Sequence, residues 1–96
     1  SSRRRSVVIG ATGESPGIEL DLRSQRADEA LDKLDGYLDR AYLARLPWVR
    51  IIHGKGTGKL RDVVREALGQ HPQVKAYESG KDGEGGDGVT VATLRS

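Results

Sequence analysis

The chain has 96 residues, a length that fits one small domain and excludes separate catalytic and regulatory domains. It carries 16 lysines and arginines against 14 acidic residues, so the net charge is only +2, and it contains no cysteine. Without cysteine there is no disulfide framework and no cysteine-based zinc site, which fits a reducing, cytoplasmic setting. No apolar run approaches the roughly 20 residues of a membrane span, so we expect no membrane partner.

The first predicted element is a strand at residues 18–23 (IELDLR), where apolar and polar side chains alternate strictly. It follows residues 1–17, which we interpret as a flexible tail or linker, and residues 18–96 form the predicted domain. Apolar residues then recur with helical period over residues 27–42. We expect this helix to take Ser24 as its N-cap and to end before Pro47.

The second half of the chain repeats the pattern and adds a strand. Residues 48–52 (WVRII) predict a second strand, and residues 60–68 predict a second helix that stops at Gly69. Residues 74–78 and 89–95 predict two more strands. The order β-α-β-α-β-β predicts an α/β (α+β) two-layer sandwich with a four-stranded mixed sheet, two helices and one partly open sheet face. We expect the tryptophan and the three tyrosines in its core.

Charge is unevenly distributed along the domain. Residues 50–65 contain five basic side chains and one acid, whereas residues 78–87 contain four acids and one lysine. A local basic patch of this kind indicates an anionic partner.

The glycine-rich turn HGKGTGK at residues 53–59 lies within that patch, between the second strand and the second helix. Glycines let backbone N–H groups approach an anion, and the helix N-terminus adds unpaired donors. The spacing matches neither a nucleoside-triphosphate loop nor a dinucleotide fingerprint. A plain connecting turn is the alternative. The predicted phosphate-binding residues are Gly54, Lys55, Gly56, Thr57, Gly58 and Lys59, with Arg61 and Arg65 extending a phosphate track along the second helix.

Candidate catalytic side chains precede and follow this turn. His53 ends the second strand, and an imidazole titrates near neutrality, so it could transfer a proton. Glu19, Asp21 and Arg23 project from one face of the first strand. They could form a solvated polar face. Alternatively, Asp21 orients His53, acts as a base or holds a divalent ion with Glu19, while Arg23 clamps a phosphate.

The order of these motifs resembles the Smr (small MutS-related) domain from about Ile18 to Leu94. The residues that carry the resemblance are ELDLR, HGKGTGKLR, HPQV and GGDGVT, in the order and at the spacing of the family. YLDRAYL and IIHGKGTGKLRDVV look most like the version at the C-terminus of the bacterial MutS paralogue that takes no part in ordinary mismatch repair. Ser24 departs from the family, which usually has glycine there, and we expect this to affect only the turn into the first helix.

The resemblance implies a fold similar to the C-terminal domain of translation initiation factor three. It implies an endonuclease that nicks branched or double-stranded DNA and suppresses recombination, or that cleaves RNA in ribosome rescue. The expected partners are therefore DNA, RNA or the ribosome, and the rest of a parent MutS-like ATPase through which the domain is dimeric. The lack of methionine fits such an excised piece. The family's functional positions correspond to Asp21, Arg23, His53, Gly54, Lys55 and Gly56, and Glu19 precedes them.

These observations support a hypothesis of phosphodiester cleavage with low sequence specificity. In it, Lys55 and the glycine-rich turn hold the phosphate, Arg23 stabilises developing charge, His53 transfers a proton, and Asp21 positions His53 or a metal. DNA hydrolysis would favour a Mg²⁺ or Mn²⁺ ion, whereas RNA cleavage could use the 2′-hydroxyl without one. One alternative is a non-catalytic module that docks the parent ATPase on DNA or ribosomal RNA. Another is a protein-interaction domain.

Overall fold

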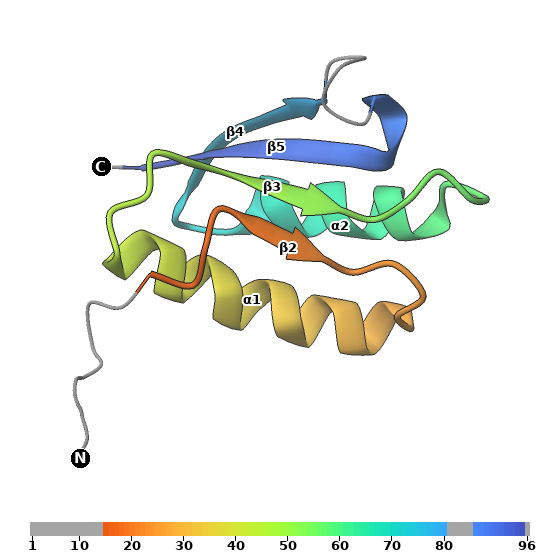
Figure 1. The fold of residues 1–96 in the computed structure, drawn as a ribbon, viewed down its shortest axis with the longest axis horizontal. Coiled ribbons are helices and arrows are strands. Elements are labelled where there is room, and N and C mark those ends of the chain that lie inside the picture. Colours follow the sequence, from red (N-terminus) through yellow and green to blue (C-terminus); the bar gives the residue numbers. More distant parts are fainter. Residues whose placement is uncertain (1–14, 81–85, 96) are drawn as a thin grey trace.

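The computed structural model describes residues 15–80 and 86–95, and its elements follow the predicted order (Figure 1). Residues 1–14 of the predicted tail, residues 81–85 within the acidic segment 78–87, and Ser96 lie outside the described residues. Along the described chain the elements are strand β2 (Glu19–Asp21), helix α1 (Ala27–Leu43), strand β3 (Trp48–Ile52), helix α2 (Lys59–Gln70), strand β4 (Val74–Ser79), the 3₁₀ turn η2 (Gly86–Gly88) and strand β5 (Val89–Leu94).

The strands form one mixed sheet in the order β2-β3-β5-β4. The strands β2 and β3, which are joined through α1, are parallel neighbours. The last strand, β5, is antiparallel to both β3 and β4 and lies between them. Therefore β3 and β4, joined through α2, run in the same direction without touching. This arrangement confirms the predicted α+β architecture.

The core lies between the two helices and one face of the sheet (Figure 1). On β3 the alternation is visible residue by residue, because Val49 and Ile51 are fully buried while Trp48 is 39% exposed on the other face. The helices contribute the apolar stripes that the sequence predicts. Their buried residues are Ala30, Leu34, Tyr37, Leu38 and Ala41 on α1, and Val64 and Leu68 on α2.

The ends of α1 differ from the prediction. Ser24 is not the N-cap: it adopts a φ of 66°, and the helix begins three residues later, after Arg26. A left-handed φ favours glycine, which gives a physical reason for the glycine that the resembling family usually has there. At the other end, Arg45 takes a φ of 62°, and the Leu46 N–H donates to the Ala41 carbonyl at 3.0 Å. A Schellman motif, rather than Pro47, therefore ends the helix.

The predicted end of α2 at Gly69 is also wrong. The helix continues to Gln70, and His71 takes an extended φ/ψ of −78° and 128°. The residue before a proline is disfavoured in the helical region, so Pro72 sets the boundary. Gly69 instead lies beside the ring of Tyr77, where a Cβ would be 3.6 Å from Cε2.

The aromatic residues contribute less to the core than expected. Tyr37 is 2% exposed, and its hydroxyl donates to the Gly17 carbonyl at 2.6 Å. Trp48, Tyr42 and Tyr77 are each more than a third exposed, so the prediction that all four aromatics anchor the core is wrong. None of the helices in the described residues combines the length and apolar composition of a membrane span.

Candidate nucleic-acid interface

Three turns meet at one end of the sheet, on the right in Figure 1. In the parallel pair β2–β3, Asp21 lies opposite Ile52, so the chain leaves both strands at the same end. The last strand starts there too, because Val89 pairs with Ile52. We call this region, formed by residues 21–26, 53–59 and 86–88, the motif end.

The three turns pack against one another at two glycines. A Cβ at Gly54 would lie 3.4 Å from Cγ of Arg23, and one at Gly88 would lie 3.4 Å from Cγ of Lys55. The Gly88 carbonyl also accepts the backbone N–H groups of His53 at 3.1 Å and of Gly54 at 3.0 Å. The side chains of Arg23 and Lys55, far apart in sequence, therefore lie against one glycine-rich backbone.

Arg23 is held by Asp21 in a two-pronged ion pair. Its Nη2 donates to Oδ2 at 2.7 Å, and its Nε donates to Oδ1 at 3.0 Å. The side-chain hydrogen bonds from Arg23, followed by its backbone N–H, lower the pKa of Asp21 to about 2. Asp21 is thus ionised at neutral pH and a weak proton acceptor. Its role in this geometry is to orient a guanidinium that stays 62% exposed.

The glycine-rich turn places backbone donors at the start of α2. Gly54, Gly56 and Gly58 all have positive φ, at 82°, 27° and 84°. The N-cap of α2 is Gly58, which has no side chain to accept the N–H groups of the first turn. The Lys59 N–H donates to Thr57 Oγ1 at 3.3 Å, and the other N–H groups of the first turn, with the exposed side chains of Lys55 and Lys59 beside them, are suited to binding an anion.

Two further features extend this surface. The Arg61 guanidinium folds back over Gly58, where a Cβ would lie 2.8 Å from Nη2, and its Nε donates to Asp62 at 3.2 Å. An open hollow of about 590 Å³ separates the starts of the two helices. Arg26, Thr57 and Lys59 are among the residues that line it, so the hollow continues the basic surface from the turn toward α1.

His53 does not contact Asp21, contrary to the predicted pairing. The ring is 5% exposed, with Nδ1 3.0 Å from the Gly54 carbonyl and Nε2 2.8 Å from the Thr90 hydroxyl. Burial, together with the positive charges of Arg65 and Arg61, lowers the pKa of His53. Both ring nitrogens are therefore engaged, beneath the glycine-rich turn.

Arg65 turns toward the sheet and not along the predicted phosphate track. Its Nε donates to the Thr90 hydroxyl at 3.0 Å, and its Nη2 donates to the Ser79 hydroxyl at 2.7 Å. The sequence placed Arg65 one helical turn beyond Arg61 on a polar face, but two hydroxyls on β4 and β5 bind its guanidinium. Lys59 lies at the motif end, and the Arg61 guanidinium lies beside it, next to Gly58.

The candidate metal ligands Glu19 and Asp21 each have an arginine partner. Glu19 lies opposite Arg50 across the β2–β3 pair, and its carboxylate accepts a hydrogen bond from Nη1 at 2.6 Å. Within the described residues, neither carboxylate belongs to a group of three or more possible ligands. Both carboxylates are paired with guanidinium groups, so a Mg²⁺ or Mn²⁺ ion bound here would compete with Arg23 and Arg50 for them.

One such group of side chains does occur, at the far end of α2. His71 Nε2 lies 3.2 Å from an Asp35 oxygen and 3.8 Å from an Asp39 oxygen. However, Nδ1 of His71 accepts the backbone N–H of Gln73 at 3.2 Å. A neutral ring must then carry its proton on Nε2, facing the carboxylates. This contact links the residue after α2 to α1, and in this tautomer Nε2 has no lone pair free for a metal.

Comparison with known proteins agrees with this arrangement of motifs. The sequence matches the family model described as Smr domain over residues 20–95. The chain is an Smr domain. The solved Smr domain of Thermus thermophilus MutS2 is similar to it, with 45% identity and a TM-score of 0.79 over 81% of this chain and 98% of that one.

Two curated relatives extend the comparison to longer proteins. The endonuclease MutS2 of Symbiobacterium thermophilum is 60% identical over 77 residues, which make up 80% of this Smr domain and 10% of the relative. The endonuclease MutS2 of Clostridium beijerinckii is 47% identical over 93 residues, or 97% and 12%. The Smr domain thus spans about a tenth of the length of these relatives.

Sequence reasoning missed the part that β5 plays in this Smr domain. Thr90 is fully buried and contacts both His53 and Arg65. The sequence signal was a hydroxyl residue near the start of a largely apolar strand, at the end of the GGDGVT motif. Because buried hydroxyls need partners, a threonine in that position could have indicated a polar contact.

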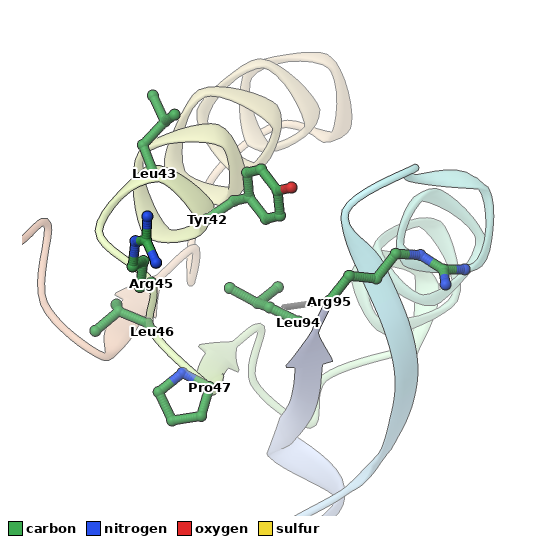
Figure 2. A pocket seen from close by; sticks show the side chains of 7 residues that line it. All are labelled: Tyr42, Leu43, Arg45, Leu46, Pro47, Leu94 and Arg95. Atoms are coloured by element: carbon green, nitrogen blue, oxygen red, sulfur yellow. The ribbon is translucent and has the colours of Figure 1, made fainter.

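A second surface of the Smr domain lies at the opposite end of the sheet. There the end of α1, the start of β3 and the end of β5 surround an open pocket of about 400 Å³ (Figure 2). The lining is mostly apolar, and Leu43 beside it is 75% exposed. This pocket is the feature that a protein-interaction role would use. Its lining residues are Tyr42, Leu43, Arg45, Leu46, Pro47, Leu94 and Arg95.

Proposed function

We propose that this Smr domain is an endonuclease module that binds the phosphodiester backbone of a nucleic acid at the motif end and cleaves it with low sequence specificity. The observation that carries the proposal is the packing of Arg23 on Gly54, beside Lys55 and the uncapped start of α2. These groups are donors or cations, and they come from two motifs separated by about thirty residues of sequence. A phosphate group is the ligand that such a set recognises.

In the proposed chemistry, these groups stabilise charge. An oxygen nucleophile adds to phosphorus and loses its proton to solvent, a bridging oxygen leaves and takes up a proton from solvent, and negative charge grows on the non-bridging oxygens between these events. The Arg23 guanidinium, oriented by Asp21, binds two of these oxygens side by side, while Lys55 and the N–H groups before α2 bind from the other side. Donors prearranged in this way typically lower a barrier by several kcal/mol.

The attacking oxygen depends on the substrate. On RNA the 2′-hydroxyl supplies it, and on DNA a water molecule must do so. We propose that either nucleic acid is bound through its backbone, because the motif end offers cations and backbone donors. In the parent MutS-like ATPase, cleavage of branched DNA would suppress recombination, and cleavage of RNA would serve ribosome rescue.

A non-catalytic module that docks the parent ATPase on DNA or ribosomal RNA is the second candidate. Two observations favour it: the low pKa of Asp21, and the engagement of both His53 nitrogens. Neither side chain is a ready proton acceptor in this structure. Such a module would still need Arg23 and Lys55 for backbone binding.

A cleavage assay separates the two candidates. Supercoiled plasmid and labelled single-stranded RNA are incubated with the 96-residue chain, with Mg²⁺ or with EDTA. If the domain is an endonuclease, it should cut at least one of the two substrates. Arg23→Ala and Lys55→Ala should then each lower the cleavage rate about 100-fold. Lys33→Ala, on the exposed face of α1, is the matched control and should keep full activity.

Binding measured in parallel completes the test. Binding without cleavage supports the docking module, and Lys55→Ala should then reduce the slope of affinity against salt concentration by about one phosphate contact. If Arg23→Ala and Lys55→Ala cleave and bind like the wild type, the motif end is not the interface.

A further inference from the structure

A chain of hydrogen bonds runs from α2 through β5 to the glycine-rich turn. Arg65 Nε donates to Thr90 Oγ1 at 3.0 Å, Thr90 Oγ1 lies 2.8 Å from His53 Nε2, and His53 Nδ1 lies 3.0 Å from the Gly54 carbonyl. A second hydroxyl, Ser79 Oγ, accepts a hydrogen bond from Nη2 of the same guanidinium at 2.7 Å. Thr90 is fully buried and His53 is 5% exposed, so the central bond between them is shielded from water.

The partners determine where the protons lie. A carbonyl oxygen only accepts, so His53 Nδ1 must carry the proton that it shares with Gly54. In the neutral ring Nε2 is then an acceptor, and the Thr90 hydroxyl donates to it. The same hydroxyl oxygen accepts from Arg65, which fixes its direction. Every donor in this series of hydrogen bonds therefore has one acceptor. All of these hydrogen bonds form together only when the His53 ring is neutral and protonated on Nδ1.

The last hydrogen bond of this series, from His53 Nδ1 to the Gly54 carbonyl, determines the orientation of the Gly54–Lys55 peptide group. In a trans peptide the carbonyl and the following N–H point in opposite directions. Since the Gly54 carbonyl is turned to the buried His53 ring, the N–H of Lys55 points away from it. Lys55 is exposed, and its N–H has no partner among the described residues. Gly54 adopts this orientation at a φ of 82°.

We propose that Arg65, Thr90 and His53 are positioning residues, which together hold the Gly54–Lys55 peptide with its N–H directed at a bound phosphate. The inference rests on the proposed function of the motif end and adds a specific donor to it. It also gives His53 a role different from proton transfer. The ring supports the turn through Nδ1, and Thr90 and Arg65 prevent it from rotating or changing tautomer.

The first test observes these hydrogen bonds directly, by NMR of the ¹⁵N-labelled 96-residue domain. The wild type should show the His53 ring protonated on Nδ1 and unprotonated on Nε2. Thr90→Ser keeps the hydroxyl and should preserve this pattern and the Lys55 amide resonance. Thr90→Val removes only the hydroxyl, and both signals should change. A wild-type ring protonated on Nε2 would overturn the proposal.

The second test measures the functional consequence. Dissociation constants for a short DNA duplex and a single-stranded RNA should rise about tenfold in Thr90→Val, the effect of one misplaced hydrogen-bond donor. Thr90→Ser should restore most of the affinity. Thr93→Val, an exposed threonine on the same strand, is the matched control and should bind like the wild type. Arg65→Gln provides a second variant in case Thr90→Val unfolds.

His53 variants separate positioning from proton transfer. Asparagine places an N–H donor near the position of Nδ1 but cannot titrate. In the cleavage assay, His53→Asn should therefore keep at least about ten times the activity of His53→Ala, because the Gly54 carbonyl retains a partner. If both variants are equally inactive while the RNA and DNA still bind, His53 acts in proton transfer and the positioning role is wrong.

These measurements distinguish a failure of the proposed function from a failure of the positioning role. Failure of the proposed function appears as a wild-type domain that binds neither the duplex nor the RNA. Failure of the positioning role appears as wild-type binding that Thr90→Val and Arg65→Gln leave unchanged, in proteins that NMR shows to be folded.

Discussion

Replacing Gly54 with alanine tests whether the contact between the two motifs matters for function. The residue has a φ of 82°, and an L-residue pays roughly 1–2 kcal/mol to adopt the left-handed region. The added Cβ would also meet Arg23 Cγ at 3.4 Å and Cδ at 3.8 Å, so any shift of the strained turn is passed directly to the stem of Arg23. We therefore expect Gly54→Ala to lose about 1–2 kcal/mol of unfolding free energy and to weaken nucleic-acid binding as well.

Gly17→Ala is the matched control for the backbone effect. Gly17 has a φ of 88°, but a Cβ there meets nothing within 4 Å, and it precedes β2 at the opposite end of the sheet. Urea denaturation should give both variants a similar loss of stability, whereas titration with labelled DNA and RNA should weaken only in Gly54→Ala. If the two variants bind equally well, the packing of Arg23 on Gly54 does not position the phosphate-binding groups.

Three other predictions concern stability and ionisation. Tyr37→Phe removes the hydrogen bond to the Gly17 carbonyl and should cost about 1 kcal/mol in urea denaturation; an unchanged midpoint would contradict this. Arg45→Gly relieves a left-handed φ of 62° and should raise the unfolding free energy by about 0.5–1 kcal/mol, whereas a loss would show that the arginine side chain matters more than its backbone. Asp21 should titrate by ¹³C NMR near pH 2 and not 3.8, and Arg23→Ala should return it toward 3.8. Because folding lowers this pKa, the contribution of the ion pair to stability is complete above about pH 4 and disappears as the pH falls through 2.

Local patterns in the sequence predicted most of the fold. Strict alternation identified the strand that carries Asp21, and helical periodicity identified α1 despite Gly36 within it. Each pattern reflects the burial of one face of a strand or helix. That face can be identified from side chains only a few residues apart in the sequence. The parallel pairing of β2 and β3 followed from the intervening helix. It correctly brought the two main motifs to the same end of the sheet.

Contacts between distant residues could not be predicted in this way. The partner of His53 is Thr90, 37 residues later, and its identity depends on β5 lying between β3 and β4. Arg65 was expected to extend the phosphate track along the second helix, yet two hydroxyls on the sheet bind it. Trp48 was expected in the core, but the residues of β3 that face the helices are Val49 and Ile51, and Trp48 lies on the other face.

Mapping the bound nucleic acid on the ¹⁵N-labelled domain tests the central claim most directly. We expect a short DNA duplex or single-stranded RNA to shift the amide resonances of the motif end, residues 21–26, 53–59 and 86–88, with Lys55 among the most affected. The apolar pocket at the other end of the sheet, around Leu46 and Leu94, should be unaffected. Shifts confined to that pocket, or spread evenly over the surface, would contradict it.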